Sequence, residues 1–356
     1  MQEKRRLEFI DIARGMAMIC IILGHLESDS INRVIYTFHV PIFFLIAGFF
    51  IDNRKSIKEF TLKRMRSLLV PYAAACAVML VIGTLETIVL TVAEYGPEHW
   101  FNAIIYGGGT WLWAAVYGAG NSFELLYYVP GIGAIWFLWA VFWGGLLLRI
   151  SLNMNKWIRP VFFAALFAAA VISKNYIWLP FSLQPGMCAG AFMYIGWLSR
   201  QAVPYVSRIH KAWKIIAVII AAAAWGTFIY DFDTFWFVRC GFGRGAIDIM
   251  RSLCACGIVM LIARIIELKL KKIGSWFAVL GKYSTLLLCI HNIELNFFPW
   301  KMAAGYLVGF GLPEWAQLPL IIAAKLAADL FMTWLLSKVA FIRKIFGYTM
   351  LKTEKN

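Results

Sequence analysis

Three ionisable side chains lie in the first apolar segment of the chain, where a helix that only crossed a bilayer would carry none. Arg14 and His25 are eleven residues apart, and Asp11 comes one turn before Arg14. Eleven residues make about three turns of an α-helix, so Arg14 and His25 project from one face, roughly 16 Å apart along the axis. Ionisable groups at membrane depth cost on the order of 3 kcal/mol each on insertion scales. The three residues therefore predict a watered cavity, lined by protein, in which something polar is handled.

The residue types indicate how chemistry would be divided in such a cavity. An imidazole titrates near neutral pH, so His25 is suited to act as a general base on a hydroxyl group. Arg14 stays cationic and offers a planar fork of donors for a phosphate, a carboxylate or a polarised carbonyl. The structural alternative for Arg14 is a salt bridge to Asp11. His39 begins the next apolar segment and should lie at the depth of His25, lining the same cavity; its alternative is a hydrogen bond to a backbone carbonyl near Pro41.

Later apolar segments carry three further polar pairs, each three or four residues apart and so on one helical face. Lys325 and Asp329 are expected to neutralise each other. His291 with Glu294 predicts an oriented imidazole or a packing contact between helices. The remaining pair is Asp248 and Arg251. From these segments we take as candidate substrate-binding residues His39, Trp136, Arg251, His291 and Glu294.

Composition places the chain among polytopic membrane proteins. Hydrophobic residues make up 62% of its 356 positions, charged residues make up 15%, and the mean hydropathy is +0.73. Continuous apolar runs of about 20 residues favour an all-α transmembrane bundle over a barrel, and we treat 1–356 as a single domain. The runs predict about ten spans, at approximately 9–27, 36–52, 68–92, 134–150, 158–174, 178–199, 213–230, 247–266, 281–299 and 317–341.

The distribution of Lys and Arg orients these spans. If the N-terminus is cytoplasmic, most of the 34 basic residues lie in cytoplasmic loops and both termini are inside, as the positive-inside rule requires. The net charge of +15 then reflects topology and anionic lipid headgroups, and no nucleic-acid partner is expected. The first cytoplasmic loop contains Lys63, Arg64 and Arg66. Its basic cluster is either a lipid-contacting loop or a landing site for an anionic nucleotide.

Two other features exclude familiar sites. Most of the seven cysteines fall within spans, and their spacing indicates neither a disulfide framework nor a metal site. No glycine-rich phosphate loop is present.

The stretch 93–133, rich in Trp, Tyr and Gly, suits an interfacial or re-entrant segment on the outer side.

Taken together, the motifs resemble the acyltransferase-3 family of integral membrane acyltransferases, especially its fucose 4-O-acetylase-like branch. The resemblance covers nearly the whole chain and depends on the order and spacing of its pieces. These are Arg-Leu-Glu-Phe-Ile-Asp-Ile-Ala-Arg-Gly at 6–15 with Gly24-His25, His39-Val-Pro-Ile-Phe-Phe, Ala47-Gly48-Phe49, Leu68-Leu69-Val70-Pro71-Tyr72, Ile135-Trp136-Phe137-Leu138, and Gly281-Lys282-Tyr283-Ser284 leading to His291.

The resemblance implies transfer of an acetyl or other acyl group from cytoplasmic acetyl-CoA to a hydroxyl of a cell-envelope or lipid-linked glycan, by an enzyme of the inner or plasma membrane. The family's arginine and histidine pair maps onto Arg14 and His25, with Asp11 beside them. Members often carry two arginines three apart in a cytoplasmic loop; this chain has Lys63 and Arg66 there, with Arg64 between them. We therefore expect Arg14 and these three residues to bind CoA, whose pantetheine arm would run along one passage from Arg14 to His25.

Two other functions fit the same residues. Buried ionisable pairs also mark transport pathways, so an amino-acid or glycan transporter without acyl transfer is the main alternative. A structural partner in an envelope-polymer complex is a more distant one. Transport predicts solute flux in proteoliposomes without consumption of acetyl-CoA, whereas a structural role predicts that Arg14 and His25 can be replaced with little effect.

Overall fold

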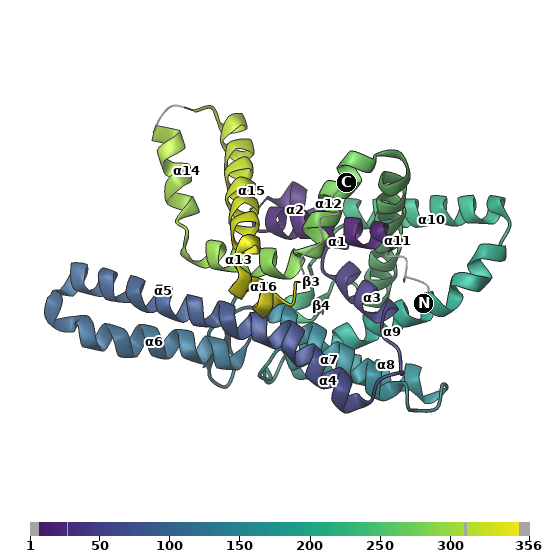
Figure 1. The fold of residues 1–356 in the computed structure, drawn as a ribbon, viewed down its shortest axis with the longest axis horizontal. Coiled ribbons are helices and arrows are strands. Elements are labelled where there is room, and N and C mark those ends of the chain that lie inside the picture. Colours follow the sequence, from purple (N-terminus) through teal and green to yellow (C-terminus); the bar gives the residue numbers. More distant parts are fainter. Residues whose placement is uncertain (1–6, 27, 310–311, 349–356) are drawn as a thin grey trace.

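The computed structural model describes residues 7–26, 28–309 and 312–348, and most of these residues are helical (Figure 1). The only strands among them form two short antiparallel hairpins, β1 (Phe123–Glu124) with β2 (Tyr128–Val129) and β3 (Phe235–Trp236) with β4 (Gly241–Phe242). The predicted all-α fold is therefore confirmed for this part of the chain. Residues 1–6, whose basic side chains contribute to the predicted orientation, lie outside the described residues.

The body of the molecule is a set of closely packed helices. It contains α1 (Glu8–Gly24), α3 (Pro41–Phe49), α7 (Trp136–Ser151), α9 (Leu183–Arg208), α11 (Ala246–Lys269), α12 (Lys271–Lys282) and α13 (Ser284–Phe297). Helix α1 packs along α12, and α9 packs on both α3 and α7. Small residues allow these approaches: Gly15 faces the backbone of Phe277, and Gly48 faces the backbone of Met193, each leaving no room for a Cβ. The backbones of α1 and α3 are thereby held in fixed positions.

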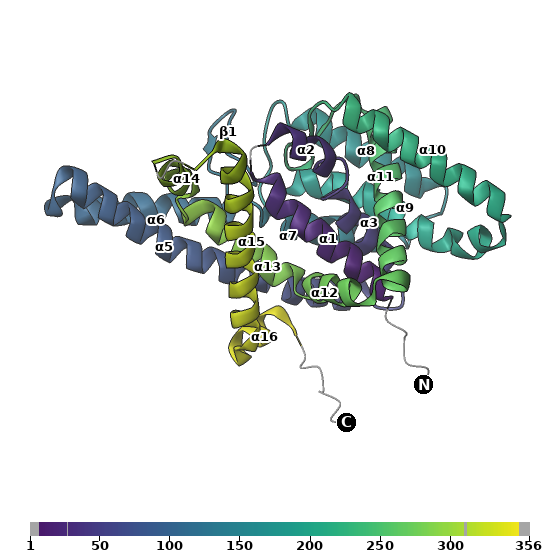
Figure 2. The same cartoon turned by 90° about the horizontal axis from the view of Figure 1, so that it is seen from above.

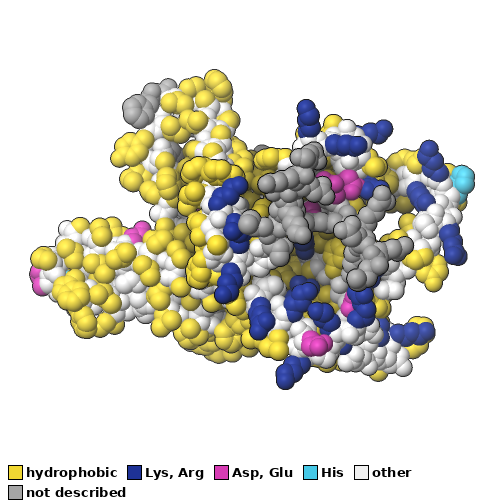
Figure 3. Space-filling view, in the orientation of Figure 1, with side chains coloured by type: hydrophobic (Ala, Val, Ile, Leu, Met, Phe, Trp, Pro, Cys, Tyr) yellow, Lys and Arg dark blue, Asp and Glu magenta, His cyan; other side chains and the backbone are white. Residues whose placement is uncertain are grey.

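Helical arms extend from this body. Helices α5 (Val70–Tyr95) and α6 (Trp100–Tyr117) form one arm, and α14 (Trp300–Gly309) with α15 (Glu314–Lys338) form another (Figure 1). Figure 3 shows hydrophobic side chains over most of both arms and a gathering of Lys and Arg over the body. Exposed large apolar residues on the first arm include Val81, Leu85, Val89, Leu90, Ile105 and Leu112. Such surfaces are stable against lipid.

The remaining elements connect these parts. They are α2 (Asp29–Ile35), α4 (Ile57–Arg64), the π-helix η1 (Met65–Leu69), the 3₁₀ turn η2 (Pro97–His99), α8 (Ile158–Ser173), α10 (Lys211–Tyr230), the 3₁₀ turn η3 (Phe237–Arg239) and α16 (Ala340–Phe346). The start of α1 and the helix α16 face the same side of the molecule (Figure 2).

Several predicted spans differ from the helices observed. By length and composition, four described helices can cross a membrane: Ile57–Tyr95, α10, α11 and residues 315–338 of α15. A fifth counts if α12 and α13, bent by 71° at their junction, form one span. The span 36–52 is wrong as a single helix, because the chain turns through 36–40 and α3 has only nine residues. With 17 and 16 residues, α1 and α7 reach only about 25 Å. Ten spans and two cytoplasmic termini stay predictions.

The stretch 93–133, expected to be interfacial or re-entrant, is helical over much of its length. Its first part is regular helix: α5 continues to Tyr95, and α6 packs back along α5. Gly83 faces the indole of Trp111 and Gly107 faces the side chain of Thr87, and neither glycine leaves room for a Cβ. These two glycines therefore let α5 and α6 lie close together.

Candidate active site

A cavity of about 710 Å³, which we call the basic cavity, lies at the end of α1 that carries Arg14. It is lined by Arg14, Ala47, Phe50, Ile51, Asp52, Arg54, Lys55, Phe60, Lys63, Arg64 and Ser67. Five of these residues are basic and one is acidic. Within the described residues no ion pair engages Lys55, Lys63 or Arg64, so the cavity is strongly electropositive. The Nη1 of Arg14 lies 3.9 Å from Oδ1 of Asp11, so the salt bridge proposed as the structural alternative for Arg14 is present.

The loop that forms one wall of this cavity is fixed at several points. Ser56 and Glu59 form a reciprocal capping box that starts α4. Arg149, buried near the end of α7, donates from Nε and Nη2 to the carbonyl oxygen of Lys55. Asp52 accepts hydrogen bonds from Arg54, which hold the pKa of the Asp52 carboxyl below its usual range. These contacts keep the basic side chains at the rim of the cavity.

Arg66 does not belong to the basic cavity. It lies in the π-helix after α4 and lines a separate, apolar hollow with Leu62, Met65 and Leu69. The structure therefore brings together Arg14, Lys63 and Arg64 from the predicted CoA-binding set, and places Arg66 on another face of the helix. Side chains two positions apart on a helix, such as Arg64 and Arg66, differ in direction by roughly 200°, so they face different cavities.

A second cavity, of about 310 Å³, lies at the other end of α1. We call it the histidine cavity, because His25 and His39 both line it; its other lining residues include Tyr36, Asn121, Trp136, Phe137, Phe235, Trp236 and Phe237. Apolar walls rich in aromatic side chains, with a few convergent polar groups, are typical of sites for small ligands. Of the predicted substrate-binding residues, His39 and Trp136 line this cavity.

His25 stands at the C-cap of α1, where its ring is exposed to the cavity. Tyr36 donates to the carbonyl oxygen of Gly24 and stacks on His39. The Nδ1 of His39 lies 2.9 Å from the carbonyl oxygen of Ile35, so its proposed backbone contact also exists.

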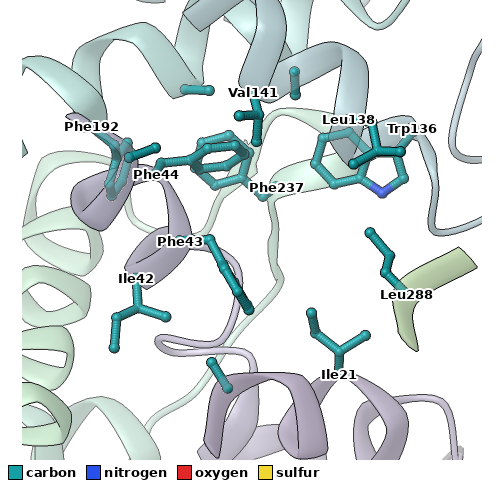
Figure 4. Packing of buried hydrophobic residues seen from close by; sticks show 14 of the residues in the cluster. Ile21, Ile42, Phe43, Phe44, Trp136, Leu138, Val141, Phe192, Phe237 and Leu288 are labelled. Atoms are coloured by element: carbon teal, nitrogen blue, oxygen red, sulfur yellow. The ribbon is translucent and has the colours of Figure 1, made fainter. Parts of the chain in front are cut away.

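Arg14 and His25 project into different cavities, and the expected single passage is not open in this structure. The two cavities share no lining residue. On α1, the positions between Arg14 and His25 on the same face are Met18 and Ile21, and Met18 is fully buried. From α3, Phe43 reaches toward the same space as Ile21 (Figure 4). A partition of flexible apolar side chains therefore separates the basic cavity from the histidine cavity.

Behind the histidine cavity lies a buried charged cluster formed by α13 and α15. His291 Nδ1 lies 2.9 Å from Asp329 Oδ2 and 3.0 Å from Glu294 Oε2. Lys325 forms its ion pair with Glu294, at 3.3 Å, so the expected pairing of Lys325 with Asp329 is wrong. A neighbouring helix supplies a better-placed carboxylate than the one on the same helix. Neither His291 nor Glu294 lines the histidine cavity.

The same cluster has a spacing that could hold a cation. One ligand atom from each of His291, Glu294 and Asp329 lies within 4.8 Å of the others. The ammonium group of Lys325 already places a positive charge beside Glu294, which accounts for the grouping of two carboxylates in an apolar surrounding.

Arg251 lies in a second ionic cluster, on the side of the molecule where α10 ends and α11 begins. It contacts Asp231 at 3.1 Å and Asp248 at 3.3 Å, and Arg244 contacts the same two carboxylates. The segment 231–245 that these contacts hold carries Phe235 to Val238, which line the histidine cavity. Arg251 thus supports a wall of the cavity and does not line it.

Comparison of the chain with known proteins identifies its family. The model of an acyltransferase domain, acyltransferase-3, matches residues 7–336. The chain belongs to the acyltransferase-3 family. It is also similar to nodulation protein NolL of Mesorhizobium japonicum, with 24% identity over 255 residues; the match covers 64% of this chain and 59% of that relative's length, less than two thirds of it. No solved structure matches the chain.

The structure contains site residues that the sequence did not single out. Arg149 fixes the wall of the basic cavity, Tyr36 packs on His39, and Asn121 and Trp236 line the histidine cavity. A signal existed only for Arg149, as a charge near the end of an apolar run. The others lie in turns and short hairpins, whose positions relative to α1 depend on tertiary packing.

Proposed function

We propose that this membrane acyltransferase moves an acetyl group from cytoplasmic acetyl-CoA to a hydroxyl of a cell-envelope or lipid-linked glycan, in the inner or plasma membrane, with His25 as the general base. One observation carries the proposal: a single helix, α1, presents an arginine to an electropositive cavity and a histidine to an aromatic one, about 16 Å apart.

The basic cavity is suited to the donor. The phosphates of CoA carry several negative charges, and Arg14, Lys63 and Arg64 converge on the cavity with the charge to hold them. The pantetheine arm is long, thin and only weakly polar. It can pass between apolar side chains such as Met18 and Phe43 when they change rotamer, because methionine adapts readily to different neighbours. The thioester would then reach His25 from the basic side.

The histidine cavity is suited to the acceptor. Aromatic side chains such as Trp136 and Trp236 offer flat faces for the C–H surface of a sugar ring, while Asn121 and His39 offer polar contacts for its hydroxyl groups. A free nitrogen of His25 removes the proton from the acceptor hydroxyl as the oxygen attacks the thioester carbonyl. The C–S bond then breaks, and the proton passes from the imidazolium to the thiolate of CoA. An acetyl-imidazole on His25 is the alternative route to the same products.

The test is acetyl transfer by the purified protein. It would be incubated with radiolabelled acetyl-CoA and a panel of membrane glycans, comparing the native protein with His25→Ala. Native protein should label a glycan, and His25→Ala should lose at least 10²-fold of the rate, the usual contribution of a general base. His99→Ala, a histidine that lines neither cavity, is the matched control and should keep full activity. Unchanged labelling by His25→Ala would overturn the assignment of the base.

A further inference from the structure

The ring of His291 is held in one orientation by acidic groups from two helices. Its Nδ1 lies within hydrogen-bond distance of Asp329 Oδ2 on α15, and Glu294 Oε2 on its own helix lies almost as near. Carboxylates only accept, so Nδ1 carries the proton and donates it. A neutral imidazole with its proton on Nδ1 presents Nε2 as an acceptor. This is the arrangement in which a buried carboxylate orients the histidine of a catalytic triad.

The acceptor nitrogen of His291 is buried and has no partner among the described residues. The His291 side chain is 0% exposed, so no bulk water satisfies this atom. The nearest ring is that of His25, with centroids 5.3 Å apart and planes tilted by 45°. At that separation two ring nitrogens that face each other lie about 3 Å apart, the length of a hydrogen bond. A rotation of the exposed His25 ring would therefore supply the missing donor.

The groups packed around His291 come from three helices. The ionisable groups that face it are Glu294 from α13, Lys325 and Asp329 from α15, and His25 from α1. Two carboxylates and one ammonium leave one formal negative charge when both rings are neutral. Both carboxylates lie at Nδ1 of His291, so its Nε2 is left to face His25.

We propose that His291 is a positioning residue for His25: its Nε2 accepts a hydrogen bond from His25, which fixes the tautomer of His25 and leaves the other His25 nitrogen free to act as the base. This rests on the proposed function. The proton taken from the acceptor hydroxyl stays on His25 until the C–S bond breaks and then passes to the thiolate, while His291 keeps its own proton on Nδ1. Asp329 and Glu294 hold His291, and Lys325 holds Glu294.

The proposal is tested by steady-state acetyl transfer with His291→Gln, Asp329→Asn and the double variant His25→Ala/His291→Gln. His291→Gln should lower kcat by about 10²-fold or more with the KM for both substrates within twofold, because it disturbs the base and not the binding sites. Asp329→Asn keeps the shape of the side chain and should lower kcat in the same way. The double variant should be no slower than His25→Ala alone, since residues that act as a unit give non-additive losses.

Thr333→Val is the matched control, one turn from Asp329 on α15 and also buried. It should keep kcat within twofold. Each variant is checked for monodispersity and thermal unfolding, so a loss caused by misfolding is recognised. The proposal is overturned if His291→Gln raises KM at unchanged kcat, if its loss multiplies that of His25→Ala, or if a stoichiometric metal is found whose removal abolishes the activity. Failure of the native protein to transfer acetyl groups would instead overturn the proposed function.

Discussion

The same side chain takes three different roles around the histidine cavity, and its partners decide which. His39 has its Nδ1 engaged with the carbonyl oxygen of Ile35, and His291 has its Nδ1 engaged with a carboxylate. His25 has neither contact among the described residues, and its ring is exposed to the cavity. A base must meet its substrate with a free nitrogen, so His25 is the one of the three suited to proton transfer.

Binding of CoA should depend on Arg64 and not on Arg66. Arg64→Gln removes a cation that lines the basic cavity, whereas Arg66→Gln changes an arginine that lines a different hollow. A hydrogen bond to a charged group contributes about 1.5–3 kcal/mol, so Arg64→Gln should raise the KM for acetyl-CoA by about tenfold or more at nearly constant kcat. Arg66→Gln should leave both constants within twofold. Equal effects of the two substitutions would show that the loop acts through its net charge alone.

At the scale of elements, α1 is the part that ties the two cavities together. Its backbone is fixed by the contact of Gly15 with Phe277 and of Gly281 with Asp11, so Arg14 and His25 cannot shift relative to each other without unpacking α12. What can move are the side chains between them. The donor and acceptor sites are therefore at a fixed separation, and access from one to the other depends on Met18 and its neighbours.

Enlarging Met18 should block transfer without preventing binding of the donor. In Met18→Trp a rigid indole would fill the partition, and we expect kcat to fall by at least tenfold while binding of acetyl-CoA, measured by calorimetry, stays within twofold. Met18→Leu has a similar volume to the native residue and is the control; such exchanges usually cost less than 1.5 kcal/mol of stability. Full activity of a folded Met18→Trp protein would mean that the thioester reaches His25 by another path.

The segment 231–245 should be sensitive to acid through Asp231. The hydrogen bond from Arg244 is the main cause that lowers the pKa of Asp231 to about 2. A carboxyl whose pKa is lower in the folded protein than in the unfolded chain, where it is about 4, stabilises the fold above that higher value. This stabilisation is lost as the pH falls through the window from about 4 to 2.

Thermal unfolding of the purified protein measures this effect. Above pH 5, Asp231→Asn should unfold at a lower temperature than the native protein by a constant difference, and this difference should vanish as the pH approaches 2. Asp233→Asn, whose carboxyl bonds only to Thr234 among the described residues, should follow the native curve throughout. A difference for Asp231→Asn that does not change with pH would contradict the role given to these ion pairs.

At the scale of the whole molecule, the sequence was most informative where one helix carried the information. The face shared by Arg14 and His25 follows from helical periodicity alone, and so does the contact of Asp248 with Arg251. The sequence was misleading where a contact involves residues from two helices. Lys325 pairs with Glu294 across helices, where Asp329 on its own helix was the expected partner. Partners of this kind depend on tertiary packing, which periodicity does not encode.

The orientation of the molecule in the membrane decides whether the basic cavity can meet its donor, because acetyl-CoA is a cytoplasmic metabolite in the proposed reaction. The positive-inside rule predicts that the loop with Lys156 is inside and the loop with Asp233 is outside. Both residues are exposed, so Lys156→Cys and Asp233→Cys should react readily with a maleimide. In intact cells a membrane-impermeant maleimide should label Asp233→Cys and leave Lys156→Cys unlabelled until the membrane is permeabilised. The native protein gives the background of its own cysteines, most of which are buried. The reverse pattern would place Arg14, Lys63 and Arg64 on the outer side, away from acetyl-CoA, and would leave their electropositive cavity in need of a different anionic ligand.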